Sequence, residues 1–174
     1  HGWGTWERLR SSPLSPAELM VGKSVVPILT ISLQLLVLLG GGALLFDMEL
    51  RGSLAAFVAV AAALAIMEVT LGFALLSICT SVIQLNALSN AGAMLLGGLG
   101  GAVTPVEFLP GWAQAIAPLT PTYWAMQGFR EVTLFSGGFS DVLVPLAVLI
   151  GFSVVFTAVA VKRFEVEDTK VSWA

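Results

Sequence analysis

The sequence predicts an all-α membrane protein with four transmembrane helices, and three observations support this fold class. First, 57% of the 174 residues are hydrophobic and only 11% are charged, whereas a soluble domain carries about 25% charged residues. Second, the charges leave uncharged runs of about 20 residues, the length that crosses a bilayer as a helix. Third, these runs are apolar on every face, whereas the strands of a membrane β-barrel alternate in polarity. The composition therefore excludes a soluble globular domain and a disordered chain.

The four predicted spans follow one another through short connections, except for one longer segment before the last span. We expect the second span to carry a single carboxylate, Glu68, and the third to end at Pro105. Ser140 or Asp141 can cap the fourth span. Residues 105–141, which we call the outer segment, join the third span to the fourth. The predicted spans are residues 24–46, 54–78, 85–104 and 142–161.

The basic residues predict the orientation of the chain. Six of the eight Lys and Arg residues precede the first span or follow the last one. Because basic residues concentrate in cytoplasmic segments, we expect a multi-pass protein of the plasma (inner) membrane with both ends cytoplasmic. Residues 1–23 and the tail 162–174 would then flank a transmembrane domain of residues 24–161. The six basic residues are Arg8, Arg10, Lys23, Lys162, Arg163 and Lys170.

The segment before the first span contains two helix signals. Residues 15–18 read Ser-Pro-Ala-Glu, the form of a capping box, so a helix is expected to start near Pro16. We expect Pro27 to interrupt this helix, because its ring removes the hydrogen bond to the carbonyl of Lys23. Residues 5–10 can form a short separate helix. Such a helix either rests on the membrane surface or acts as a lever that contacts another protein.

Residues 17–24 come within one residue of a phosphate-binding loop. They read A-x-x-x-x-G-K-S, with Ala17 where such a loop needs a glycine to wrap its backbone around a phosphate. No predicted strand precedes them, and a transmembrane span follows. We therefore expect this chain to bind neither a nucleotide nor another cofactor.

The outer segment is too apolar and too rich in proline for an ordinary loop. Four of its apolar residues fall on one face at helical spacing, so a helix over residues 110–117 is expected to lie in the membrane interface. Pro118 and Pro121 would stop this helix, and a second helix would begin after Thr120-Pro121 and include Tyr123. The four apolar residues are Trp112, Ala115, Ile116 and Leu119.

Two separated stretches of the chain carry a recognisable pattern. One is Gly101-x-x-x-Pro105-x-Glu107-x-Leu109-Pro110-x-Trp112, followed by Ile116, Pro118, Pro121-x-Tyr123 and Arg130. The other is Gly4-Thr5-Trp6-Glu7-Arg8-Leu9, followed by Ser12-Pro13-Leu14-Ser15 and Gly22-Lys23. Together they resemble the ABC-2 type transporter permeases, the transmembrane subunits of ABC exporters. The resemblance covers essentially the whole chain. It implies the C-terminal portion of a six-helix permease, with the four spans as its third to sixth helices.

This resemblance implies an ATP-driven exporter that moves a drug, lipid or glycan outward. In such an exporter two permease copies, identical or different, form the pathway through the lipid bilayer. Separate ATP-binding cassette subunits hold ATP and Mg beneath them. The family places a coupling helix in the segment that precedes the first span here. We predict that this helix contacts the ATPase through Thr5, Trp6, Glu7, Arg8, Leu9 and Arg10.

Glu68 and a row of small residues are the unusual features within the spans. A carboxylate in the bilayer core costs about 2.5–3.5 kcal/mol on insertion scales, so it faces other helices or water. Glu68, with Gly72 on its helical face, either packs between helices or serves substrate passage or proton coupling. Ala93, Gly97 and Gly101 either pack tightly within one permease or, as the family suggests, line the pathway near the dimer axis.

Two other classes of protein fit the composition. A four-helix structural or assembly subunit of another membrane complex is one, but it leaves the two family-like stretches unexplained. An intramembrane enzyme is the other, and it would need a nucleophile with a base, or a metal cluster. The chain has one Cys and one His, the latter at position 1, so we predict no catalytic residue and no metal site. The net charge of −3 gives no indication of nucleic-acid binding.

Overall fold

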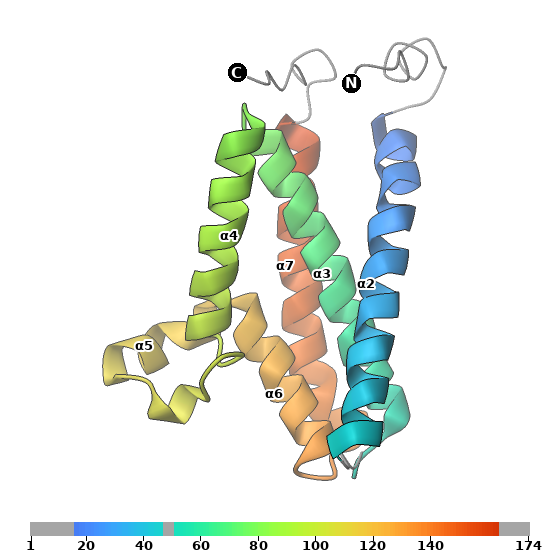
Figure 1. Cartoon of the computed structure of the whole chain (residues 1–174), viewed down its shortest axis with the longest axis vertical. Coiled ribbons are helices and arrows are strands. Elements are labelled where there is room, and N and C mark those ends of the chain that lie inside the picture. Colours follow the sequence, from blue (N-terminus) through green and yellow to red (C-terminus); the bar gives the residue numbers. More distant parts are fainter. Residues whose placement is uncertain (1–15, 47–50, 164–174) are drawn as a thin grey trace.

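A computed structural model describes residues 16–46 and 51–163, and the regular elements in these two ranges are all helices (Figure 1). Four of the described helices are long and apolar enough to cross a membrane. They are α2 (Pro16–Phe46), α3 (Leu54–Ile78), α4 (Val82–Leu99) and α7 (Leu143–Arg163). The shorter helices are η1 (Val106–Phe108), α5 (Gly111–Ile116), η2 (Ala117–Leu119), α6 (Pro121–Thr133) and η3 (Ser140–Val142).

The four long helices run alternately up and down the molecule (Figure 1). The start of α2, the turn between α3 and α4, and the end of α7 lie at one end of the bundle. The start of α3 and the end of α6 lie at the opposite end. This is the arrangement of a chain that crosses a bilayer an even number of times.

The end of α4 corrects the prediction for the third span. The helix starts at Val82 and ends at Leu99, so the expectation that it continues to Pro105 is wrong. Gly101 has a φ of 86°, and the N–H of Ala102 donates to the carbonyl of Gly97 at 2.9 Å. A left-handed glycine followed by this hydrogen bond closes a helix before any proline is reached.

The path of α2 corrects a second prediction. α2 is one helix of 31 residues and continues through Pro27, so the expected interruption there is wrong. Proline removes only one hydrogen bond from the ladder. In a bilayer the helix is the one local conformation that satisfies the remaining backbone groups, so proline is tolerated within membrane helices.

The start of α7 differs from the expected cap. The one-turn helix η3 precedes it and has no side-chain cap. Instead, Asp141 Oδ2 accepts a hydrogen bond from the N–H of Gly138, upstream in the loop, at 2.7 Å. The carboxylate therefore fixes the turn before the helix rather than the first turn of the helix itself.

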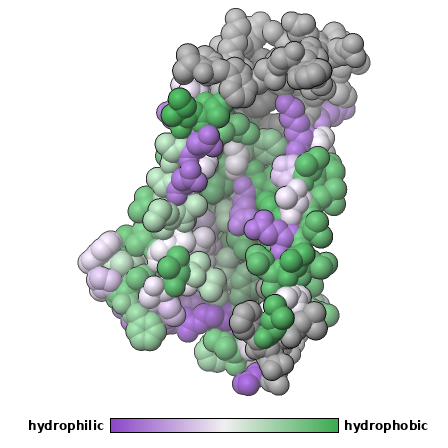
Figure 2. All heavy atoms as spheres, viewed as in Figure 1, coloured by the Kyte–Doolittle hydropathy of each residue, from purple (hydrophilic) through white to green (hydrophobic). Residues whose placement is uncertain are grey.

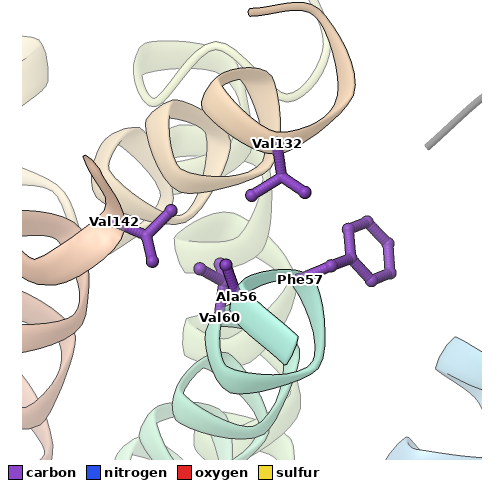
Figure 3. Packing of buried hydrophobic residues seen from close by; sticks show 5 residues of the cluster. All are labelled: Ala56, Phe57, Val60, Val132 and Val142. Atoms are coloured by element: carbon purple, nitrogen blue, oxygen red, sulfur yellow. The ribbon is translucent and has the colours of Figure 1, made fainter. Parts of the chain in front are cut away.

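The core of the molecule lies where α3 packs against α6 and α7. At one end of α3 a cluster joins α3 and α6 to η3, which leads into α7, through Ala56, Phe57, Val60, Val132 and Val142 (Figure 3), and Leu146 of α7 packs against it. A second cluster, halfway along α3, contains Ala63, Met67, Ala125 and Leu149. A side chain added at Gly128 of α6 would meet Val60 at 2.9 Å and Pro145 at 3.3 Å. Small residues thus let these helices approach closely, as is common in membrane bundles.

The connection between α2 and α3 is fastened to the end of α6. The N–H groups of Gly52 and Ser53 donate to the carbonyls of Val132 and Gly137, at 2.9 and 3.1 Å. The Ser53 hydroxyl also accepts from the N–H of Ala56 and so caps α3. These hydrogen bonds hold the start of α3 and the end of α6 together.

α2 and α4 are packed far less than α3. No residue of α4 is buried by the described part of the chain, and the same holds for the apolar stretch of α2. Leu36 of α2 is 69% exposed and Met94 of α4 is 80% exposed. The surface of this side of the molecule is largely hydrophobic (Figure 2). Surfaces of this kind face lipid or another protein.

Candidate functional site

The outer segment is joined to α4 by a close contact between the end of α4 and the start of α6. The hydroxyl of Thr122 donates to the carbonyl of Leu96. Gly100 is buried at this contact, and a Cβ there would overlap the Thr122 side chain. Because only glycine fits beside Thr122, Gly100 allows the start of α6 to pack directly against the end of α4.

An ion pair holds the two halves of the outer segment together. Arg130 Nη1 of α6 lies 2.5 Å from Glu107 Oε1 of η1, and both side chains remain partly exposed. The hydrogen bond from Arg130 holds the pKa of the Glu107 carboxyl below its ordinary value. The carboxylate is therefore charged and paired at neutral pH.

A small cavity lies next to this ion pair, between the end of α4 and one side of α6. Its volume is about 270 Å³. We call Pro105, Glu107, Pro110, Trp112, Pro121, Tyr123 and Arg130, from the family-like pattern of the outer segment, the signature residues. Three of them, Pro105, Tyr123 and Arg130, line the cavity together with Gly101. The structure thus brings together Gly101 and Arg130, which are 29 positions apart in the sequence.

The remaining signature residues shape the short helices. Pro110 precedes α5, and Pro121 is the first residue of α6, where its missing N–H is tolerated. The hydroxyl of Thr120 caps α6 by accepting from the N–H of Tyr123. Trp112 is 67% exposed. The other three residues of the expected interfacial face, Ala115, Ile116 and Leu119, are exposed as well.

α6 reaches deep into the bundle. Ala125, near its start, packs with Met67, which lies about 20 Å from the start of α3 at 1.5 Å per residue. Val132, near its end, packs with Ala56 in the first turn of α3. α6 therefore runs from the level of the middle of α3 to the end of the bundle.

Glu68 is exposed in the described part of the chain, although it lies halfway along a transmembrane helix. Among the described residues, no hydrogen bond or ion pair joins its carboxylate to another side chain. Leu64 and Leu71, one turn away on either side, pack against the second core cluster. Gly72 has nothing within 4 Å of the place where a side chain would begin. Within the described residues, the carboxylate is therefore not part of a packed helix interface.

The small residues of α4 are also unpacked within the described chain, apart from the end of the helix. Ala93 is exposed, and Gly97 has nothing within 4 Å of its Cβ position. Gly101 differs, because a side chain there would meet Val106 at 2.8 Å. The row of small residues therefore does not serve close packing against α3 or α6.

The predicted coupling residues, Thr5, Trp6, Glu7, Arg8, Leu9 and Arg10, lie outside the described residues. Their role stays a prediction. The described chain begins with α2 at Pro16, and α2 continues without a break from there into the first span.

Two features of the site were not predicted from the sequence. The pairing of Glu107 with Arg130 has a signal, because these are the only charged residues between Glu68 and Glu131. Two opposite charges alone in an apolar segment are expected to meet. The contact of Gly100 with Thr122 has no such signal, since several glycines compete for the same place in the sequence.

The helices and the outer segment define a multi-pass membrane protein with an elaborate element between its last two spans. Comparison with known proteins identifies the class more closely. The family described as "ABC-2 family transporter protein" matches residues 4–162. This chain therefore belongs to the ABC-2 family of transporters.

Two curated relatives are similar to this chain. Both are named "Probable multidrug ABC transporter permease YbhR", one from Escherichia coli strain K12 and one from Escherichia coli O157:H7. Each is 28% identical over 132 residues, which is 75% of this chain and 34% of the relative. The chain thus spans 34% of the length of these relatives. No solved structure matches the chain.

Proposed function

We propose that this chain is the membrane-spanning permease part of an ATP-driven exporter that moves a drug, lipid or glycan outward. The observation that carries this proposal is the family match over residues 4–162, which includes every described helix except the last residue of α7. A drug is the first substrate to test, because the curated relatives are named as multidrug permeases.

ATP and Mg would bind to a separate ATPase subunit. The one loop-like sequence here that approaches a phosphate-binding motif has Ala17 in place of the required glycine. It also lies in the first turns of α2 rather than between a strand and a helix. Neither feature suits a nucleotide site on this chain.

A second permease copy would complete the bundle. The exposed side of α4, with Ala93 and Gly97, offers small residues against which another helix can pack closely. Large apolar residues of α2, among them Leu33, Leu36 and Val37, are exposed as well. These surfaces support assembly as a homodimer or heterodimer in the bilayer.

We propose that α5 and α6 form a re-entrant element on the outer side of the membrane. The packing of Ala125 against Met67 supports this, because it places the start of α6 level with the middle of α3. The exposed Trp112 suits a position at the bilayer surface.

The orientation that goes with this proposal has both ends of the chain in the cytoplasm of an inner-membrane protein. Single cysteines at positions 49 and 138 should react with a membrane-impermeant reagent added from outside. Cysteines at positions 12 and 168 should not. Labelling of position 12 from outside would overturn the orientation.

The coupling segment provides the test of the whole proposal. In the full-length permease with its ATPase, we expect Leu9→Asp to leave membrane insertion and dimerisation intact but to uncouple transport from ATP hydrolysis. A central apolar anchor usually contributes more to an interface than charges at its rim. Arg8→Ala, the control, should do less, since an exposed ion pair contributes about 0.2–1 kcal/mol.

ATPase association in detergent and transport into vesicles would be measured for both variants. If Leu9→Asp associates and transports like the parent, the segment is only a membrane-surface helix. If no ATPase subunit associates with the parent permease, the exporter proposal itself fails.

A further inference from the structure

Three polar residues lie at similar depths, near the middle of three neighbouring helices. Glu68 is about 21 Å from the start of α3 and about 15 Å from its end, at 1.5 Å per residue. Gln34 is about 18 Å from the end of α2, which lies beside the start of α3 (Figure 1). Asn90 is about 12 Å from the start of α4, which follows the end of α3 through a short turn. Gln34 and Asn90 therefore each lie within about 3 Å of the depth of Glu68, one on either side of it, so the three span about 6 Å of depth.

These three residues, which we call the midplane face, are all exposed in the described part of the chain. On α3, Met67 is buried in the core cluster shared with α6 and α7. Ala65 and Val69 are buried on the opposite side of the same helix, and Glu68 falls between these two sides. Figure 2 shows hydrophilic residues halfway along the side of the molecule formed by α4, α3 and α2, within a mostly hydrophobic surface.

The midplane face carries one negative charge, that of Glu68, and no positive charge. Glu68 is the only charged residue in the sequence ranges 24–46, 54–78, 82–99 and 143–161, which make up the spans. No Lys or Arg within these ranges can neutralise it. Gln34 and Asn90 add amides, which both donate and accept hydrogen bonds and carry no charge. An isolated carboxylate in a bilayer is costly and usually marks a pathway or a counter-ion.

We propose that the midplane face binds lipophilic organic cations during transport, with Glu68 as the counter-ion. This inference rests on the proposed exporter function and names the substrate class. A bulky monovalent cation supplies the missing positive charge, and its apolar groups contact the leucines that flank Glu68. Gln34 and Asn90, from the helices on either side, hydrogen-bond to polar groups of the substrate. An anion of the same shape is repelled by the carboxylate and binds more weakly.

Two ions of matched shape and opposite charge provide the test, tetraphenylphosphonium and tetraphenylborate. Binding of each would be measured directly on the full-length permease purified in detergent, with and without its ATPase. We expect the parent to bind the cation, and the anion at least tenfold more weakly. Glu68→Gln should weaken cation binding on the order of tenfold or more, because it removes one member of a poorly solvated charge pair. Glu68→Asp should retain most of the affinity.

Glu131→Gln is the matched control, since it removes a carboxylate from the end of α6, away from the midplane face. It should leave cation binding unchanged. Association of each variant with the ATPase reports that the permease is folded. If Glu68→Gln binds the cation like the parent, Glu68 is a protonated packing residue and the proposal is overturned. Equal binding of the two ions by the parent also overturns it, whether or not the variant folds.

Failure of this inference can be distinguished from failure of the exporter function. A permease that associates with its ATPase and transports a neutral drug, but binds no cation, refutes only the assignment of the midplane face. If the permease binds the cation through Glu68 but associates with no ATPase, the exporter proposal is refuted and the assignment of the midplane face as a cation site stands.

Discussion

The helices of this molecule fall into two groups that differ in how completely they are packed. α3, α6 and α7 share two clusters of buried residues. α2 and α4, by contrast, have apolar stretches with no buried residue in the described part of the chain. A bundle whose contacts were complete would bury its small residues between helices. The difference indicates that α3, α6 and α7 fold as a unit, whereas α2 and α4 depend on lipid or further protein.

Two glycines make this comparison testable, because one lies in each group. Gly128→Leu in α6 should have the largest effect of the substitutions considered. The new side chain would have to displace Val60 and Pro145, whose atoms lie 2.9 and 3.3 Å from the Cβ position. Overpacking of this kind costs typically about 1–3 kcal/mol, and a leucine should reach the upper end. Thermal unfolding of the purified protein in detergent would measure the loss.

Gly97→Leu in α4 is the matched control, since nothing lies within 4 Å of its Cβ position. It should not lower the unfolding temperature of the isolated permease, and should raise it slightly because leucine favours a helix more than glycine does. Any loss should appear only in assembly with a second copy. A large drop in the unfolding temperature of the Gly97→Leu monomer would show that other residues pack against α4 at Gly97, where the structure leaves open space. The contrast between the two groups of helices would then be lost.

The junction between the groups should give an intermediate effect. Gly100→Ala places a methyl group where the Thr122 hydroxyl now lies, so the hydrogen bond from Thr122 to Leu96 must be lost or moved. We expect a destabilisation of about 1 kcal/mol, at the lower limit for overpacking. Gly98→Ala, in open space two residues earlier, should instead stabilise α4 by about 0.5–1 kcal/mol. Equal unfolding temperatures for the two variants would contradict the contact between α4 and α6.

Much of the fold could be predicted from the sequence, because long uncharged runs leave a chain few choices in a bilayer. α3 begins and ends at the residues predicted for the second span. The end of α4 could not be placed, because Pro105 is the stronger stop signal in the sequence. Gly101 is one of several closely spaced glycines there, and it takes up the left-handed conformation. The course of α2 through Pro27 was missed because the stop rule for proline comes from helices in water.

Some residues of the candidate site were singled out from the sequence, but their contacts were not. Pro105, Tyr123 and Arg130 were chosen from a family-like pattern, and they meet around one cavity. Glu68 was expected to face other helices or water, and the sequence could not show that the described neighbours leave it exposed. Which neighbours cover a side chain is a property of tertiary packing and of partners.

The smallest predicted effect concerns the ion pair of the outer segment. The pKa of Glu107 is lowered, chiefly by the hydrogen bond from Arg130. A carboxyl whose pKa is lower in the folded state stabilises that state above its unfolded pKa and loses this contribution as the pH falls through the folded value. The attachment of η1 to α6 should therefore be unchanged between pH 8 and pH 6, and should weaken only below the ordinary pKa of 4.5. Protection of the amides in residues 102–110, measured by hydrogen exchange and corrected for the intrinsic pH dependence of the exchange reaction, would report this weakening. Glu107→Gln should lower the protection modestly at pH 7 and abolish its acid-induced loss, because both side chains are partly exposed and the pair is screened by solvent. A loss of protection in acid that persists unchanged in Glu107→Gln would show that another group fastens the outer segment.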